Sequence, residues 1–79
     1  MTEIPRTVTA RQFIKALHED GFALRRTRGS HRIYRHPDGR RVILAFHHLG
    51  DTFPLGTFKA MIGDAGWTEA DLRRLGLVK

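Results

Sequence analysis

The sequence predicts an α+β fold with the element order α-β-β-β-α and a short C-terminal helix. Three observations support this prediction: a capped helical stripe near the N-terminus, a central alternating pattern with two turn signals, and a second helical stripe after Pro54. We expect the strands to form a three-stranded antiparallel sheet with the helices on one face, in a single domain spanning residues 1–79.

The first helix is expected over residues 10–20. Thr9 and Gln12 have the three-residue spacing of a capping box, in which two side chains and two backbone N–H groups pair reciprocally. Apolar residues then recur at helical spacing, and Asp20-Gly21 supplies the stop. Residues 1–8 are expected to form a loose leader before this helix.

The middle of the chain has the period of two that is typical of strands. Phe22 to Thr27 alternates and predicts a half-exposed strand, which Arg28-Gly29-Ser30 ends. His31 to His36 and Arg41 to Phe46 predict the second and third strands, with the turn residues Pro37-Asp38-Gly39 between them. These short connections favour an antiparallel meander.

The last third of the chain is expected to be helical. After a loop over residues 47–53, apolar residues at i, i+3 and i+4 spacing predict a helix that Gly66 closes. Thr68 and Asp71 give a weaker capping signal for a short terminal helix that ends at Gly76. Residues of all these elements are expected to form the core, among them Phe13, Leu17, Leu44, Phe58 and Ile62.

The composition excludes several classes of protein. Without cysteine the chain has no disulfide scaffold, no Cys-ligated zinc and no thiol catalysis. Its longest apolar run, Val42 to Phe46, is far shorter than the roughly 20 residues of a membrane-spanning helix. Residues 1–20 contain no apolar secretory segment. We therefore expect a soluble, cytoplasmic protein with no membrane partner.

Arginine dominates the charge of the chain. Fourteen Lys and Arg against eight Asp and Glu give a net charge of +6, and seven of the eleven arginines lie between Arg25 and Arg41. The planar guanidinium group matches phosphate oxygens, so such a block is expected in a protein that binds nucleic acid. A solvated surface or a patch for an acidic protein partner is the alternative.

His31 is the candidate for chemistry because it follows Gly29-Ser30 inside the arginine block. Imidazole exchanges protons readily at neutral pH, and RNA carries its own nucleophile in the 2′-hydroxyl group. One positioned base with cationic stabilisation of the phosphate can therefore cleave RNA without a metal or cofactor. The residues alone leave open whether His31 is catalytic, packs in the sheet or binds phosphate without cutting.

The other histidines carry weaker signals. His18 is expected on the surface of the first helix. His47 and His48 are neighbours, so an extended backbone points them to opposite faces. A metal site built from His31, His36 and His47 has no supporting spacing. The carboxylates are scattered singly and no phosphate-binding glycine loop is present, so we expect no metal and no cofactor.

Several motifs occur together in one chain. They are Gly21-Phe22, Arg28-Gly29-Ser30-His31, Tyr34, Pro37-Asp38-Gly39, Gly56-Thr57 and Asp64-Ala65-Gly66. In this combination the chain resembles the HicA-type mRNA interferase toxins of bacterial toxin–antitoxin pairs, from the first helix to Gly66. Many members have proline and a basic residue before the histidine that follows the third strand, where this chain reads Ala45-Phe46-His47.

The resemblance implies a fold similar to a double-stranded-RNA-binding domain. It also implies a ribosome-independent endoribonuclease that cleaves mRNA, with the histidine at the His31 position as the catalytic residue. That histidine would act as general base toward the 2′-hydroxyl or as general acid toward the leaving oxygen. A HicB-type antitoxin would bind the toxin and cover the site.

Phosphate contacts are expected from an RNA-binding set consisting of Arg25, Arg26, Arg28, Gly29, Ser30, Arg32 and Arg35. Gly29 either lets the backbone approach phosphate or only forms the turn, and Tyr34 either stacks a base or packs in the core. Trp67 is expected to pack as an anchor for the terminal helix, with antitoxin contact as the alternative. Phe53 and Trp67 are the exposed aromatics expected to be most available to an antitoxin.

Two other functions fit the same residues. A non-catalytic RNA-binding domain would hold RNA without cutting it, and its affinity would also fall steeply with salt. A protein–protein adaptor would use the arginines against an acidic surface and would show no salt-sensitive RNA binding. Only the nuclease would lose activity, but not affinity, on replacement of His31.

Overall fold

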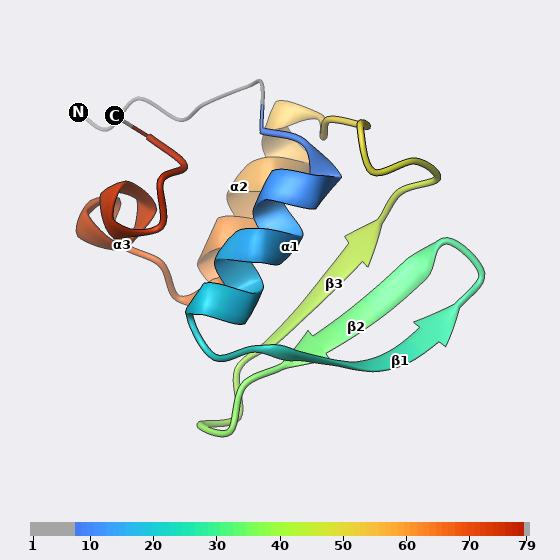
Figure 1. The fold of residues 1–79 in the computed structure, drawn as a ribbon, viewed down its shortest axis with the longest axis horizontal. Coiled ribbons are helices and arrows are strands. Elements are labelled where there is room, and N and C mark those ends of the chain that lie inside the picture. Colours follow the sequence, from blue (N-terminus) through green and yellow to red (C-terminus); the bar gives the residue numbers. More distant parts are fainter. Residues whose placement is uncertain (1–7, 79) are drawn as a thin grey trace.

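The computed structural model describes residues 8–78, and its elements follow the predicted order (Figure 1). The helices are α1 (Ala10–Glu19), α2 (Leu55–Ala65) and α3 (Glu69–Arg74), and the strands are β1 (Ala23–Arg28), β2 (His31–Arg35) and β3 (Arg41–Ala45). The strands pair antiparallel in the order β1-β2-β3, and the helices gather on one side of the sheet. The predicted α+β class is confirmed.

The first helix begins and ends at the predicted signals. Thr9 Oγ1 accepts a hydrogen bond from the N–H of Gln12, and the N–H of Thr9 donates to Gln12 Oε1 at 2.8 Å. Gly21, with φ +99°, turns the chain out of the helix, and a Cβ there would lie 2.9 Å from Nε2 of His36. Of the expected leader, residues 1–7 lie outside the described residues, whereas Val8 is buried.

The core lies between the helices and the sheet, with Phe13 at its centre. The Phe13 ring contacts Phe58 and Trp67, with ring centroids 5.7 and 5.1 Å away. From the sheet, Tyr34, Val42 and Leu44 supply buried side chains. The predicted core residues are all in this cluster, with Ile62 partly buried at its margin; the core role of Tyr34 is the one the structure supports.

The expectation of two exposed aromatic side chains is wrong. Phe53 is 9% exposed and Trp67 is 6% exposed. Phe53 packs edge-on against Phe13, and the Trp67 indole is fixed by Phe13 together with a hydrogen bond from Nε1 to Asp20. Trp67 therefore anchors the C-terminal segment to α1, in the packing role expected of it, and neither buried ring is available to a partner.

The first strand also differs from its prediction. All six residues of β1 are exposed, where a half-exposed strand was expected. The physical reason is that the helices lie over the β3 side of the sheet, where they bury Val42 and Leu44, and leave β1 at the opposite edge uncovered. Phe22, the apolar residue that made the alternation look amphipathic, is buried just before the strand starts.

No helix among residues 8–78 is long and apolar enough to cross a membrane.

Candidate nucleic-acid interface

The pairing register assigns every strand residue to one of two faces. Val42, Leu44 and Tyr34 are buried on the face toward the helices, which we call the inner face. Because side chains alternate along a strand, the intervening residues lie on the opposite, outer face. From β2 and β3 these outer residues are His31, Ile33, Arg35, Arg41, Ile43 and Ala45.

A β-bulge in β1 adds cations to the outer face. Leu24 pairs with Tyr34 and Arg26 pairs with Ile33, so Arg25 is an extra residue between two ladder positions. Alternation from Leu24 places Arg25 on the outer face, and pairing with Ile33 places Arg26 there as well. Arg28 pairs with His31 and shares the same face. The bulge thus puts two consecutive arginines on one side of the sheet.

His31 lies between an arginine and a small residue. Its Cα partners are Arg28 on β1 and Ala45 on β3. Side chains directly opposite in an antiparallel pair have Cβ atoms about 5 Å apart, so the Arg28 side chain starts beside the imidazole. The methyl group of Ala45 leaves the other side of the ring open. His31 is exposed, so solvent and ligands reach it.

The turn before His31 is a two-residue connection, Gly29-Ser30, between the paired residues Arg28 and His31. Gly29 has φ +58°, a backbone conformation that residues other than glycine rarely adopt. A Cβ on Gly29 would meet no atom within 4 Å, so the turn is open to an approaching ligand. The carbonyl of Ser30 accepts the N–H of Phe46 at 3.2 Å, which ties the turn to the end of β3.

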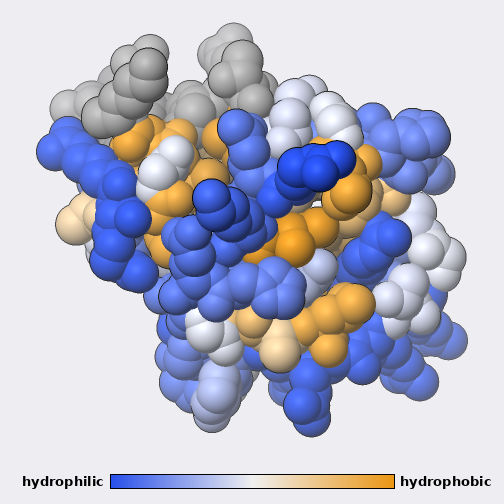
Figure 2. All heavy atoms as spheres, in the orientation of Figure 1, coloured by the Kyte–Doolittle hydropathy of each residue, from blue (hydrophilic) through white to orange (hydrophobic). Residues whose placement is uncertain are grey.

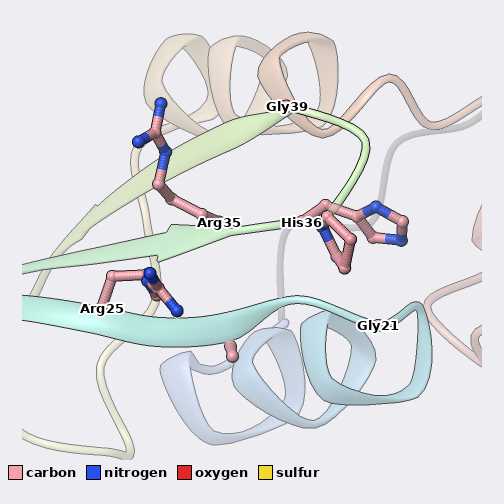
Figure 3. Close-up of a pocket in the computed structure, with 7 residues that line it drawn as sticks. Gly21, Arg25, Arg35, His36 and Gly39 are labelled. Carbon is pink, nitrogen blue, oxygen red and sulfur yellow. The ribbon is translucent and has the colours of Figure 1, made fainter.

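The outer face ends in a shallow hollow of about 500 Å³ (Figure 3). Arg25 and Arg35 reach into it from neighbouring strands. Its remaining lining consists of Gly21, Ala23, His36, Pro37 and Gly39. Two arginines in the lining make the hollow positively charged, which suits an anionic group such as phosphate.

The structure divides the predicted RNA-binding set. Arg25, Arg26, Arg28 and Arg35 lie on the outer face with His31. Arg32 pairs with Leu44 and lies on the inner face, where its guanidinium carbon sits 4.3 Å from the centroid of the Phe46 ring. Arg32 therefore packs against an aromatic side chain and does not share a surface with His31.

Arginines of the outer face are free of carboxylates. Among residues 8–78, no Asp or Glu oxygen lies within 4.0 Å of the cations on Arg25, Arg26, Arg28, Arg35 or Arg41. Figure 2 shows that hydrophilic side chains cover much of the visible side of the molecule, with apolar atoms between them. Unpaired guanidinium groups keep their donors available for phosphate.

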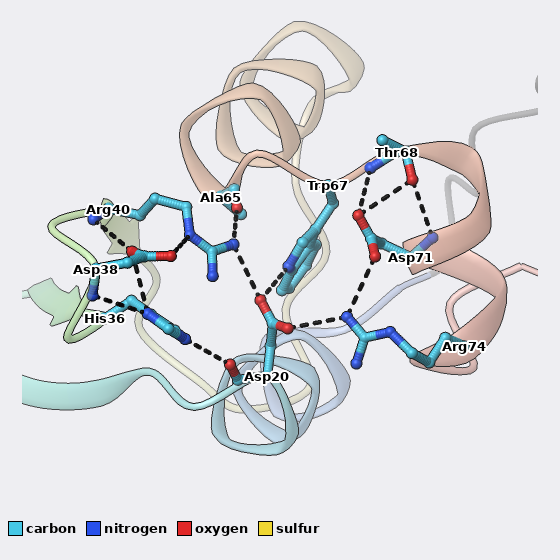
Figure 4. A network of polar contacts seen from close by, with 9 residues as sticks. All are labelled: Asp20, His36, Asp38, Arg40, Ala65, Trp67, Thr68, Asp71 and Arg74. Carbon is cyan, nitrogen blue, oxygen red and sulfur yellow. Dashed lines mark hydrogen bonds and ion pairs between the residues drawn. The ribbon is translucent and has the colours of Figure 1, made fainter.

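Other arginines are committed to a polar network around Asp20 (Figure 4). The Asp20 carboxylate, 12% exposed, accepts hydrogen bonds from Trp67 Nε1 at 2.8 Å, Arg74 at 2.9 Å and Arg40 at 3.1 Å. Burial raises the pKa of Asp20, but these three donors outweigh it and hold the pKa below its usual range. Arg40 also donates to the carbonyl of Ala65 and to Asp38. This network joins α1, the β2–β3 turn, α2 and α3.

Three of the remaining histidines have structural or loop positions. Nδ1 of His36 lies 3.1 Å from the backbone nitrogen of Asp38 and 3.0 Å from Asp38 Oδ1, and Nε2 lies 2.9 Å from the carbonyl oxygen of Asp20. The backbone N–H groups of His47 and His48 both donate to Asp51. His18 is exposed on α1, as predicted. No cluster of three metal-ligating side chains occurs within residues 8–78.

Sequence reasoning missed two features of the outer face. Arg41 pairs with Arg35 and adds a fifth cation, and Ile33 pairs with Ile43 beside His31. The signal for both was the turn at residues 37–39, because a fixed turn sets the register of the hairpin and therefore the faces of β2 and β3.

Comparison with known proteins agrees with this arrangement. A family model described as the HicA toxin of bacterial toxin–antitoxin systems matches residues 10–67, from the start of α1 to Trp67. No curated protein matches the chain. The fold and the family match define a toxin component of a bacterial toxin–antitoxin system. The chain belongs to the HicA toxin family, and this membership implies a cognate antitoxin as its partner.

Proposed function

We propose that the protein is a cytoplasmic, metal-independent endoribonuclease that cleaves mRNA at the outer face of its sheet, with His31 as the catalytic residue. The observation that carries the proposal is the position of His31, exposed and paired with Arg28 on a face whose five arginines have no carboxylate partner within residues 8–78. We further propose that residues 1–79 act as a single domain and that the antitoxin is of the HicB type.

The chemistry needs few groups. His31 takes the proton of the 2′-hydroxyl, the 2′-oxygen bonds to phosphorus, and the bond to the 5′-oxygen breaks. The products are a 2′,3′-cyclic phosphate and a 5′-hydroxyl end, the latter formed when the leaving oxygen receives a proton from imidazolium or water. Arg28, beside His31, would stabilise the negative charge that builds up on the phosphate oxygens.

The test compares the wild type with His31→Ala and with His48→Ala as a matched control. His48 is an exposed histidine in the loop after β3. A labelled oligoribonucleotide and its 2′-deoxy counterpart serve as substrates, with EDTA present throughout. We expect the wild type and His48→Ala to cleave the oligoribonucleotide at similar rates. His31→Ala should cleave it about 10²-fold to 10⁴-fold more slowly. The deoxy substrate should stay intact with all three proteins.

A second function, RNA binding without cleavage, uses the same face. It would be favoured if the wild type retained the oligoribonucleotide in a salt-dependent way and left it intact. Equal cleavage by wild type and folded His31→Ala would remove His31 from the chemistry. Activity that EDTA abolishes and a divalent cation restores would contradict metal independence.

A further inference from the structure

The outer face has an apolar centre between two cationic ends. Ile33 and Ile43 are direct partners across β2 and β3, and Ile43 remains 42% exposed. Arg28 stands at the His31 end and Arg25, Arg35 and Arg41 stand at the other end, while Arg26 flanks the isoleucine pair, opposite Ile33 on β1. Alternate residues on a strand are about 6.7 Å apart, so His31 and Arg35 are separated by about 13 Å with the isoleucine pair midway.

This layout suits an unpaired nucleotide better than a duplex. A duplex offers a phosphate-lined surface and keeps its base faces stacked inside, so it gains nothing from an apolar centre. A single strand can rest a base face on apolar side chains while its flanking phosphates meet cations. The isoleucine pair would not contribute to binding a purely anionic ligand, because isoleucine has no hydrogen-bond donor for phosphate.

We propose that Ile33 and Ile43 form a platform for one unpaired nucleobase next to the scissile phosphate, with a second phosphate of the same strand in the Arg25–Arg35 hollow. The inference deepens the proposed function, on which it rests, by naming single-stranded RNA as the substrate and Ile43 as a positioning residue. Ala45, opposite His31, leaves room for the ribose between the platform and the imidazole.

The experiment measures binding without cleavage. The His31→Ala protein is titrated against fluorescent oligouridine, the same oligomer with one abasic position, and a duplex of equal length. Ile43→Ala is added to this background, with Leu49→Ala as the matched control because Leu49 is equally exposed, at 42%, in the loop after β3. Circular dichroism and thermal unfolding check that each variant folds.

We expect Ile43→Ala to weaken binding of the intact single strand about threefold to tenfold, at the lower end of the loss for one aromatic base contact because isoleucine has no aromatic face. The abasic oligomer should bind equally to the proteins with and without Ile43, and Leu49→Ala should change nothing. In the cleaving protein, Ile43→Ala should raise KM for the single strand with little change in kcat.

Three results would overturn the platform. The first is unchanged oligouridine binding by Ile43→Ala, and the second is duplex binding as tight and as sensitive to Ile43 as that of the single strand. The third is loss of antitoxin binding in Ile43→Ala with RNA binding intact, which would assign the isoleucines to the protein partner. Absence of binding to every RNA would instead remove the proposed function, so the two failures are distinguishable.

Discussion

The outer face of the sheet and the Asp20 network use the same side chain in opposite ways. Around Asp20, Arg40 and Arg74 donate to a mostly buried carboxylate and hold four elements together. On the outer face, five arginines have no carboxylate partner among the described residues and lie beside an exposed histidine. The comparison shows what distinguishes a structural arginine from one that is free to bind a ligand. The difference is whether a carboxylate or carbonyl group pairs with its guanidinium group, and not how many arginines lie nearby in the sequence.

Arg40 and Arg41 illustrate the point within two consecutive residues. Arg40 lies directly before β3. Its guanidinium group packs over the Phe22 ring and donates hydrogen bonds to Asp20 and to the carbonyl of Ala65. Arg41 pairs with Arg35 and joins the outer face. One is part of the scaffold and the other part of the candidate interface, although the sequence presents them as a pair.

The largest expected effect comes from Asp20→Ala. The variant leaves Trp67 Nε1, Arg40 and Arg74 without their shared acceptor, and removing one partner of a mostly buried ion pair costs about 3 kcal/mol or more. Urea denaturation should record this loss of unfolding free energy. Asp64→Ala, an exposed carboxylate on α2, is the control and should change stability by less than about 0.5 kcal/mol. Equal effects of the two would contradict the network's role.

Trp67→Phe isolates one donor of the same network. It keeps an aromatic ring against Phe13 and removes the indole N–H that donates to Asp20. Hydrogen bonds to charged groups contribute about 1.5–3 kcal/mol, so the variant should be destabilised within that range while oligoribonucleotide affinity stays unchanged. An affinity loss without a stability loss would place Trp67 in the interface.

Arg28→Gln and Arg40→Gln test the contrast directly. Arg28→Gln should weaken RNA binding, lower the dependence of log affinity on log salt by about one, and leave stability within about 0.5 kcal/mol. Arg40→Gln should lower the melting temperature and leave the salt dependence as it is, because its donors already serve Asp20 and Asp38. Identical salt dependences for the two variants would break the distinction.

The smallest expected effect is on acid stability. Because the pKa of Asp20 is lower in the folded protein than its ordinary value of 3.8, its ionised form stabilises the fold above that value. The contribution is lost as pH falls through the depressed folded pKa. Urea midpoints measured from neutral pH downward should therefore fall less for Asp20→Asn than for the wild type. The strand residues described on the outer face include no carboxylate, so Arg28→Gln should follow the wild type.

The helices and turns could be predicted because their signals are local in the sequence. The capping pairs Thr9–Gln12 and Thr68–Asp71 both form in the structure, and Gly66 ends α2 in the left-handed conformation. Each of these features involves residues within a few positions of one another, so the sequence displays them directly. The His31 neighbourhood was predictable for the same reason, since Gly29-Ser30 places Arg28 and His31 opposite each other.

Long-range contacts were not predictable in this way. The bonds of Asp20 join residues 20, 47 and 54 positions apart, and no local pattern reports them. Trp67 is buried by contacts with Phe13 and Asp20, which are distant in the sequence, so the residues around it do not indicate its burial. Arg32 was grouped with its neighbours because the faces of β2 became known only from its pairing with Leu44 of β3.

The bulge at Arg25 has a consequence for how β1 tolerates changes in length. In a regular strand, deleting one residue slips the ladder and sends every later side chain to the wrong face. In β1 the residue at position 25 is already outside the ladder, between the pairs Leu24–Tyr34 and Arg26–Ile33. Deleting it restores ordinary alternation and moves no other residue to a new face. The strand can therefore be shortened by one residue with the loss of one cation from the outer face and from the hollow that Arg25 lines.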